Sequence, residues 1–186
     1  ARLALQKPLV TLLIERVSAL VPRPEGVKVL ENVGSVEKAV ERVEKLAEEL
    51  GAALAQAGYV VLTGGRPVGV MAAVSRAARA AGGLVVGILP GPDVDGCAPG
   101  VDIAIATSLG DGRNVVNILS SDVVIALPGG AGTASEIALA VKNRKPLVLL
   151  GVDPGPMVEE AIRQGRAARA QNVQEALGWV ENFLNS

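Results

Sequence analysis

Three glycine-rich turns hold the residues of this chain whose types and spacing could do chemistry. They span residues 34–35, 64–69 and 128–133. Each follows an apolar segment and leads into a predicted helix, whose N-terminus offers unpaired N–H groups and a positive dipole end that suit phosphate. Glycine also lets the backbone approach an anion closely. The candidate phosphate-binding residues of the three turns are Gly34, Ser35, Gly64, Gly65, Gly129, Gly130, Gly132 and Thr133.

The spacing of the glycines narrows the class of ligand. None of the turns matches the dinucleotide-binding pattern G-x-G-x-x-G or the ATP-binding pattern G-x-x-x-x-G-K-[ST]. A single glycine-rich turn can also have a purely structural role, because α/β folds need glycine at such turns for packing. Three turns at one edge of a sheet favour a phosphate site over packing alone.

Two charged side chains are expected beside these turns. Glu136 lies one helical turn after the third of them, where its carboxylate could accept a hydrogen bond from a ribose hydroxyl or orient a water molecule. The alternative is a capping box, in which Thr133 caps the helix and Glu136 only satisfies a backbone N–H. Arg113 precedes a short predicted helix, and its planar guanidinium suits a phosphate or a carboxylate. The alternative for Arg113 is a solvated position in a loop.

The composition excludes several other kinds of site. The 186 residues include no histidine and a single cysteine, Cys97, which excludes a Ser-His-Asp triad, a histidine metal site, a cysteine-based zinc site and an internal disulfide. Asp93–Gly96 lacks the downstream ligands of a calcium loop, so no metal site is expected. A net charge of −1 and an aromatic content of 2% give no footprint for nucleic acid or for an anionic membrane.

Apolar strands that alternate with helices predict an α/β, Rossmann-like, doubly wound fold, with a mainly parallel sheet and helices on both faces. Apolar runs predict strands over residues 27–33, 59–63, 84–89, 101–106, 122–127 and 146–151. Helices are predicted over residues 35–57, 68–81, 113–120, 133–143, 156–165 and 173–184. Residues 25–186 are therefore expected to form one nucleotide-binding domain, whose ligand lies past the carboxyl ends of the strands.

The first 24 residues are expected to form a helical extension. Apolar residues at helical spacing predict a helix over Leu9–Val21, with Pro8 in its first turn. This helix either docks on a partner subunit or covers its own sheet, and the sequence leaves both open. Charged residues interrupt the apolar run, which argues against a membrane span. No signal-peptide cleavage pattern follows, so a cytoplasmic protein is expected.

The third turn and its helix resemble a known family. Pro128–Glu136, with the sequence PGGAGTASE, matches the P-G-G-x-G-T-x-x-E motif of the LOG (Lonely Guy) family, often labelled lysine decarboxylases. Residues 64–71, GGRPVGVM, resemble that family's G-G-x-x-V-G-L-M turn, and Arg113 lies where the family has an arginine. Residues 110–139 are most similar to the branch of the family that includes molybdenum-cofactor carrier-like proteins.

The resemblance implies hydrolysis of the N-glycosidic bond of a nucleoside 5′-monophosphate, which releases a free base and ribose 5-phosphate. The phosphate would rest on Gly129–Thr133, and Arg113 and Glu136 would be the catalytic pair. Loss of the base gives the sugar oxocarbenium character that a carboxylate stabilises, while a preorganised arginine holds the phosphate. The resemblance implies no cofactor, a small phosphorylated molecule as ligand, and a homo-oligomer (a dimer or a tetramer), as is usual in the family.

Two departures from the family pattern keep other interpretations open. Family enzymes carry Arg-Lys where this chain has Arg113-Asn114, which removes a cation from the pocket. Arg66 replaces a small residue in the second turn, where it either supplies that charge or blocks the pocket. The alternatives to a hydrolase are a carrier that binds a phosphorylated pterin-like cofactor or a nucleotide without turnover, and an oligomer with a decayed site.

The lysines do not support a lysine decarboxylase. That reaction needs pyridoxal phosphate on a lysine Schiff base. No lysine of this chain is predicted at the carboxyl end of a strand beside a phosphate-binding turn. The six lysines are Lys7, Lys28, Lys38, Lys45, Lys142 and Lys145.

Overall fold

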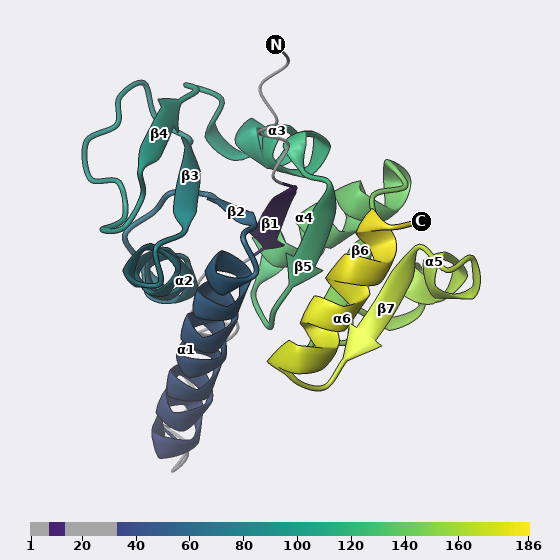
Figure 1. The fold of residues 1–186 in the computed structure, drawn as a ribbon. Coiled ribbons are helices and arrows are strands. Elements are labelled where there is room, and N and C mark those ends of the chain that lie inside the picture. Colours follow the sequence, from purple (N-terminus) through teal and green to yellow (C-terminus); the bar gives the residue numbers. More distant parts are fainter. Residues whose placement is uncertain (1–7, 14–32) are drawn as a thin grey trace, which may run out of the picture.

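The computed structural model describes residues 8–13 and 33–186. Seven strands in these residues form one parallel sheet, in the order β4-β3-β2-β1-β5-β6-β7 (Figure 1). Every neighbouring pair of strands is parallel. The strands are β1 (Leu9–Leu13), β2 (Val60–Thr63), β3 (Leu84–Leu89), β4 (Ile103–Ala106), β5 (Val123–Ala126), β6 (Leu147–Leu150) and β7 (Ala167–Ala170). The chain winds outward from β1 to β4 and then returns to β5, so the winding direction reverses between β1 and β5.

Helices cover both faces of this sheet. One core cluster joins the strands to α1, α2 and α6, and a second joins them to α3, α4 and α5. Figure 1 looks onto the face that carries α1 and α6. The helices are α1 (Val33–Gln56), α2 (Gly69–Ala80), α3 (Arg113–Ser120), α4 (Ala131–Lys142), α5 (Glu159–Arg163) and α6 (Val173–Leu184), with the short 3-10 helices η2 (Gly110–Gly112) and η3 (Gly155–Val158). The predicted doubly wound α/β fold is confirmed.

The strands are apolar throughout because both of their faces are buried. In β5, Val123 and Ile125 belong to the core beneath α1, α2 and α6, whereas Val124 and Ala126 belong to the core beneath α3, α4 and α5. All four side chains are fully buried. This alternation is the period of two that a strand imposes on its side chains.

Close packing of α1 on α2 places the long first helix against the sheet. Gly51 lies in this contact, where an added Cβ would be 2.6 Å from the carbonyl oxygen of Val74 in α2. Leu50 and Leu54 are fully buried on the same side of α1. A glycine at this position therefore sets how closely the two helices approach.

The prediction for the N-terminal segment is wrong where the structure describes it. Leu9–Leu13 is not helical but forms β1, which pairs with β2 and β5 in the middle of the sheet. The reason is that a short apolar run has no periodicity that separates a buried strand from a buried helix. The predicted helical extension over residues 1–24 therefore contains a core strand of the domain. The rest of that helix and the predicted strand over residues 27–33 lie outside the described residues, except Val33, which begins α1.

The remaining predictions agree with the structure, with one strand missed. The predicted helices over 113–120 and 173–184 match α3 and α6. The strand β7 was not predicted, because its sequence Ala-Ala-Arg-Ala has no β-branched residue and carries the half-exposed Arg169. Its partner β6 covers one side, and α5 and α6 cover its faces.

Candidate functional site

The loop between β2 and α2 is fixed by close packing at the carboxyl end of β2. Gly64 and Gly65 are buried there. Gly65 has a φ of +68°, which favours glycine, and its N–H donates a hydrogen bond to Oγ1 of Thr63 at 3.1 Å. A Cβ on Gly65 would lie 3.2 Å from Cα of Gly87 in β3. Thr63, which is fully buried, is a site-shaping residue that sequence reasoning missed.

Arg113 reaches across to this loop from the start of α3. An added Cβ on Gly64 would lie 2.1 Å from Nη1 and 2.7 Å from Cζ of Arg113, so the guanidinium occupies the space that the glycine leaves open. Only 4% of Arg113 is exposed. The alternative of a solvated loop arginine is therefore wrong. A buried guanidinium loses its hydration, so its N–H groups require acceptors in the protein interior or on a ligand.

Two asparagines share the buried side of α3 with Arg113. Asn114 is 5% exposed, and Asn117, one turn beyond Arg113, is 1% exposed. The side-chain oxygen of Asn114 is buried and accepts no hydrogen bond from the described residues. Such an unmatched acceptor costs about 1–3 kcal/mol, which a ligand N–H could recover. Asn117 was missed in the sequence, although a polar residue four positions after Arg113 on an amphipathic helix was the available signal.

The loop between β5 and α4 carries the motif that resembles the LOG family. Gly130 caps α4, and no side chain makes a capping hydrogen bond. Thr133 and Glu136 lie inside the helix, one turn apart, and are 2% and 4% exposed. The capping-box alternative is therefore wrong: the helix begins at Ala131, so Thr133 is not its cap. The carboxylate of Glu136 is held in the interior below the positive end of α4.

These groups lie along one edge of the sheet. The β2–α2 loop and the β5–α4 loop leave the carboxyl ends of strands on either side of β1, where the winding reverses. The helices α3 and α4 pack against each other, so the segments that carry Arg113 and Glu136 are neighbours. A helix N-terminus, a buried cation and a buried carboxylate together can bind a phosphate and can stabilise positive charge on a sugar.

Among the other predicted site residues, Gly129 and Gly132 lie at the expected loop, whereas Gly34, Ser35 and Arg66 do not lie as expected. Gly34 and Ser35 are not in a turn but in the first turn of α1. Gly129 and Gly132 are partly buried on either side of Gly130. Arg66 is exposed, so it does not fill the buried space beside Gly64, which Arg113 occupies instead.

Residues 8–13 and 33–186 contain no group of three or more acidic or cysteine side chains that could hold a metal ion. Asp93 instead accepts a hydrogen bond from the N–H of Asp95 at 3.2 Å, as in an ordinary turn. Within the same ranges, no helix is both long enough and apolar enough to cross a bilayer.

Comparison with known proteins places the chain in a family. Residues 28–177 match the SLOG cluster 4 family. A protein of Mycobacterium tuberculosis named cytokinin riboside 5′-monophosphate phosphoribohydrolase is 40% identical over 118 residues, which are 59% of this chain and 62% of that protein. The chain spans about half the length of further phosphoribohydrolases that it matches, from rice and Mycobacterium marinum.

Solved structures match over nearly the whole chain. The molybdenum cofactor carrier protein of Chlamydomonas reinhardtii has a TM-score of 0.76 and 35% identity, over 97% of this chain and 100% of that one. The molybdenum cofactor binding protein of Rippkaea orientalis has a TM-score of 0.75 and 36% identity, over 97% and 99% of the two chains. The resemblance to the LOG family and to its carrier branch is confirmed. The chain belongs to the SLOG cluster 4 family.

Proposed function

We propose that this protein binds a phosphorylated small molecule at the carboxyl edge of the sheet and retains it without turnover, as a carrier. The phosphate would lie at the N-terminus of α4, near Gly129–Thr133, with Arg113 as its cation. The observation that carries this proposal is the buried guanidinium of Arg113 against Gly64, at the edge where the winding of the sheet reverses.

Two observations favour retention of the ligand over its hydrolysis. The solved structures of a molybdenum cofactor carrier protein and of a molybdenum cofactor binding protein match 97% of this chain at 35% and 36% identity. The buried oxygen of Asn114, which no described residue satisfies, suits an N–H of a pterin or of a purine. An asparagine at this position can recognise such a ring but cannot supply the cation of the enzymes.

The test is to identify what the protein retains and whether it changes it. Protein purified without oxygen is denatured, and the released small molecules are identified by mass spectrometry, for the wild type and for Arg113→Ala. We expect a phosphorylated compound, near one per chain, in the wild type and a strong reduction in the variant. Equal amounts in both proteins, or no phosphorylated compound in either with no affinity for added nucleotides, would contradict the proposal.

A second candidate is hydrolysis of nucleoside 5′-monophosphates, favoured by the presence of both Arg113 and Glu136 in the interior. In this reaction the bond from the anomeric carbon to the base nitrogen breaks, the hydroxyl of a water molecule adds to the anomeric carbon, and the other proton of that water passes to the base. Glu136 would stabilise the oxocarbenium-like sugar and orient that water, while Arg113 and the α4 N-terminus hold the phosphate.

Hydrolysis is tested with AMP, GMP, CMP, UMP and a modified adenosine monophosphate. Released base is measured by chromatography for the wild type, for Glu136→Gln and for Glu160→Gln, whose carboxylate is exposed on α5. Base release that falls at least about 100-fold in Glu136→Gln alone would establish the enzyme. If Glu136→Gln still releases base, the role assigned to Glu136 is wrong. If the wild type releases base from none of the substrates, hydrolysis is excluded for them and the carrier proposal remains.

We further propose that the chain forms a homo-oligomer through an apolar face. Five large apolar side chains on and around β4, η2 and α3 are between 40% and 54% exposed. A patch of this kind in a folded domain marks an association surface. These residues are Ile103, Ile105, Leu109, Val115 and Leu119. The cytoplasmic location and the size of the assembly stay predictions.

A further inference from the structure

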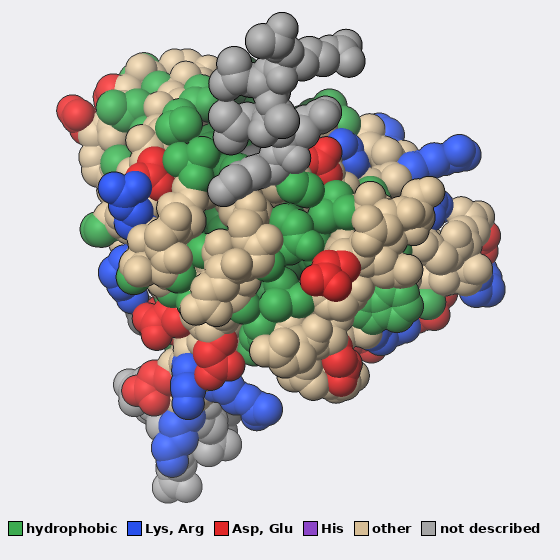
Figure 2. All heavy atoms as spheres, in the orientation of Figure 1, with side chains coloured by type: hydrophobic (Ala, Val, Ile, Leu, Met, Phe, Trp, Pro, Cys, Tyr) green, Lys and Arg blue, Asp and Glu red, His purple; other side chains and the backbone are tan. Residues whose placement is uncertain are grey.

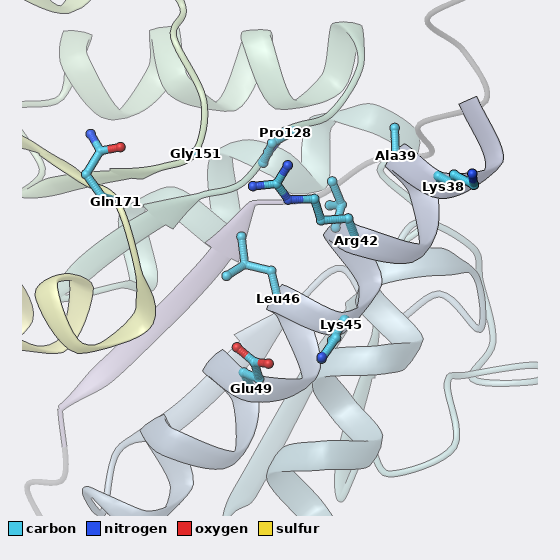
Figure 3. Close-up of a pocket in the computed structure, with 10 residues that line it drawn as sticks. Lys38, Ala39, Arg42, Lys45, Leu46, Glu49, Pro128, Gly151 and Gln171 are labelled. Carbon is cyan, nitrogen blue, oxygen red and sulfur yellow. The ribbon is translucent and has the colours of Figure 1, made fainter. Parts of the chain in front are cut away.

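A cavity lies on the same edge of the sheet as the proposed phosphate site, between α1 and the ends of β5, β6 and β7 (Figure 3). Its volume is about 780 Å³, within the range of about 300–1,000 Å³ that ligand pockets have. Pro128 follows β5, Gly151 follows β6 and Gln171 follows β7, and all three line it. Neither Arg113 nor Glu136 lines this cavity.

Positive charge gathers at this cavity from one helix. Lys38, Arg42 and Lys45 all line it and recur along α1 at spacings of four and three residues, which places them on one stripe of the helix. Figure 3 shows the Arg42 side chain directed from α1 toward Pro128. Figure 2 shows Lys and Arg side chains interspersed with Asp and Glu side chains on the part of α1 at the lower left.

The cations have no carboxylate partner within the described ranges. The side chains of Lys38, Arg42 and Lys45 make no ion pair or hydrogen bond with the residues that the structure describes. Glu49 is the one carboxylate among the residues that line the cavity, while Glu48 of the same helix pairs with Arg76 at 3.1 Å. The lining therefore carries an excess of positive charge, which favours an anion.

Part of the cavity lining is apolar. Ala39, Val43 and Leu46 of α1 line it together with Pro128. Gly151 has a φ of +69°, a backbone conformation that favours glycine at this side of the cavity. Apolar lining residues beside cationic side chains suit a ligand that has both a flat ring or sugar and a charged group, rather than a free inorganic anion.

The two regions share the loop after β5. Pro128 lines the cavity, and Gly130, two residues later, caps α4 at the proposed phosphate site. We propose that the cavity is a second anion subsite, so that the protein prefers a nucleotide-like ligand with two phosphate groups over one with a single phosphate. This inference rests on the proposed phosphate site at α4, and it assigns Lys38 and Arg42 to the second group.

The test compares AMP with two ligands that carry a second phosphate, ADP and adenosine 3′,5′-bisphosphate, by isothermal titration calorimetry. We expect one of the two to bind about tenfold more tightly than AMP, which is about 1.4 kcal/mol, because Lys38 and Arg42 would contact the second phosphate. In Lys38→Ala/Arg42→Ala this advantage should fall to about twofold or less, with AMP affinity unchanged. Lys142→Ala removes an exposed lysine from the far end of α4 and should keep the advantage.

The outcomes separate this inference from the proposed function. Suppose that Arg113→Ala weakens AMP binding, but that the wild type binds ADP and adenosine 3′,5′-bisphosphate no more tightly than AMP. The phosphate site at α4 is then supported and the second subsite is wrong. The subsite is equally wrong if the advantage survives in Lys38→Ala/Arg42→Ala, or if Lys142→Ala removes it as well. If the wild type binds none of the three ligands, both proposals are overturned. The charge reversal Arg42→Glu should make the second phosphate unfavourable relative to AMP.

Discussion

Replacing Gly64 with alanine tests how Arg113 is positioned. The added Cβ would lie 2.1 Å from Nη1, 2.7 Å from Cζ and 2.7 Å from Nη2 of Arg113. Because ordinary contacts are longer than 3.4 Å, the guanidinium must move by about 1 Å or more. Arg113 is 4% exposed, so it has little free space to move into. The substitution therefore acts on the cation of the proposed phosphate site without removing its charge.

The expected effects on binding and on stability differ in size. Losing one or two charge-assisted hydrogen bonds to phosphate costs about 1.5–3 kcal/mol, so the affinity for a phosphorylated ligand should fall about 10- to 100-fold. Overpacking should lower the free energy of unfolding by about 1–3 kcal/mol. Affinity is measured by isothermal titration calorimetry and stability by urea unfolding. Gly91→Ala is the matched control, because Gly91 follows β3 and an added Cβ there meets nothing within 4 Å.

A double-mutant cycle decides whether Gly64 acts through the arginine. If it does, Gly64→Ala should cost almost no further affinity when it is introduced into Arg113→Ala. Additive losses would mean that Gly64 contacts the ligand by itself. Unchanged affinity and stability in Gly64→Ala would refute the placement of the guanidinium against this glycine.

Three further predictions concern the fold and the assembly. Deleting residues 1–24 removes the central strand β1 and should abolish the cooperative urea transition; a truncated chain with unchanged stability would contradict this position of the strand. Gly51→Ala should lower the free energy of unfolding by about 1–3 kcal/mol, because the added Cβ would meet the backbone of α2. Gly178→Ala, in open space on α6, should raise it by up to about 1 kcal/mol. Equal changes in the free energy of unfolding of the two variants would refute the close contact. Val115→Glu/Leu119→Glu on the apolar face should convert an oligomer into a monomer, as measured by sedimentation, and an unchanged assembly would exclude that face.

Most helices and strands of the fold could be predicted from the sequence, but the central strand of the sheet could not. Long helices such as α6 have a clear amphipathic period, and buried strands such as β3 are continuous apolar runs between turns. The strand β1 was misassigned because its five residues, four of them apolar, fit a helix and a strand equally well. The strand β7 was missed because alanine and arginine carry no strand preference, so only its pairing with β6 defines it.

The candidate site was predictable in its residue types but not in its contacts. The motif around Glu136 indicated the helix and its N-terminal turn, although the helix begins two residues earlier than predicted. The glycine at position 64 was expected to admit an anion, and the structure places the guanidinium of Arg113 against it instead. That contact joins residues 49 positions apart, which no local pattern reports. The cavity beside α1 depends in the same way on where α1 lies relative to the ends of β5, β6 and β7.

The most direct test of the central claim measures what the phosphate group contributes to binding. The dissociation constants of AMP and adenosine, and of a pterin phosphate and its dephosphorylated form, are compared on the wild-type protein by calorimetry. The account predicts that in at least one pair the phosphorylated ligand binds at least about 100-fold more tightly, because the α4 N-terminus and Arg113 bind the phosphate. Equal affinity within both pairs, or no binding by either phosphorylated ligand, would contradict a phosphate site at this edge of the sheet.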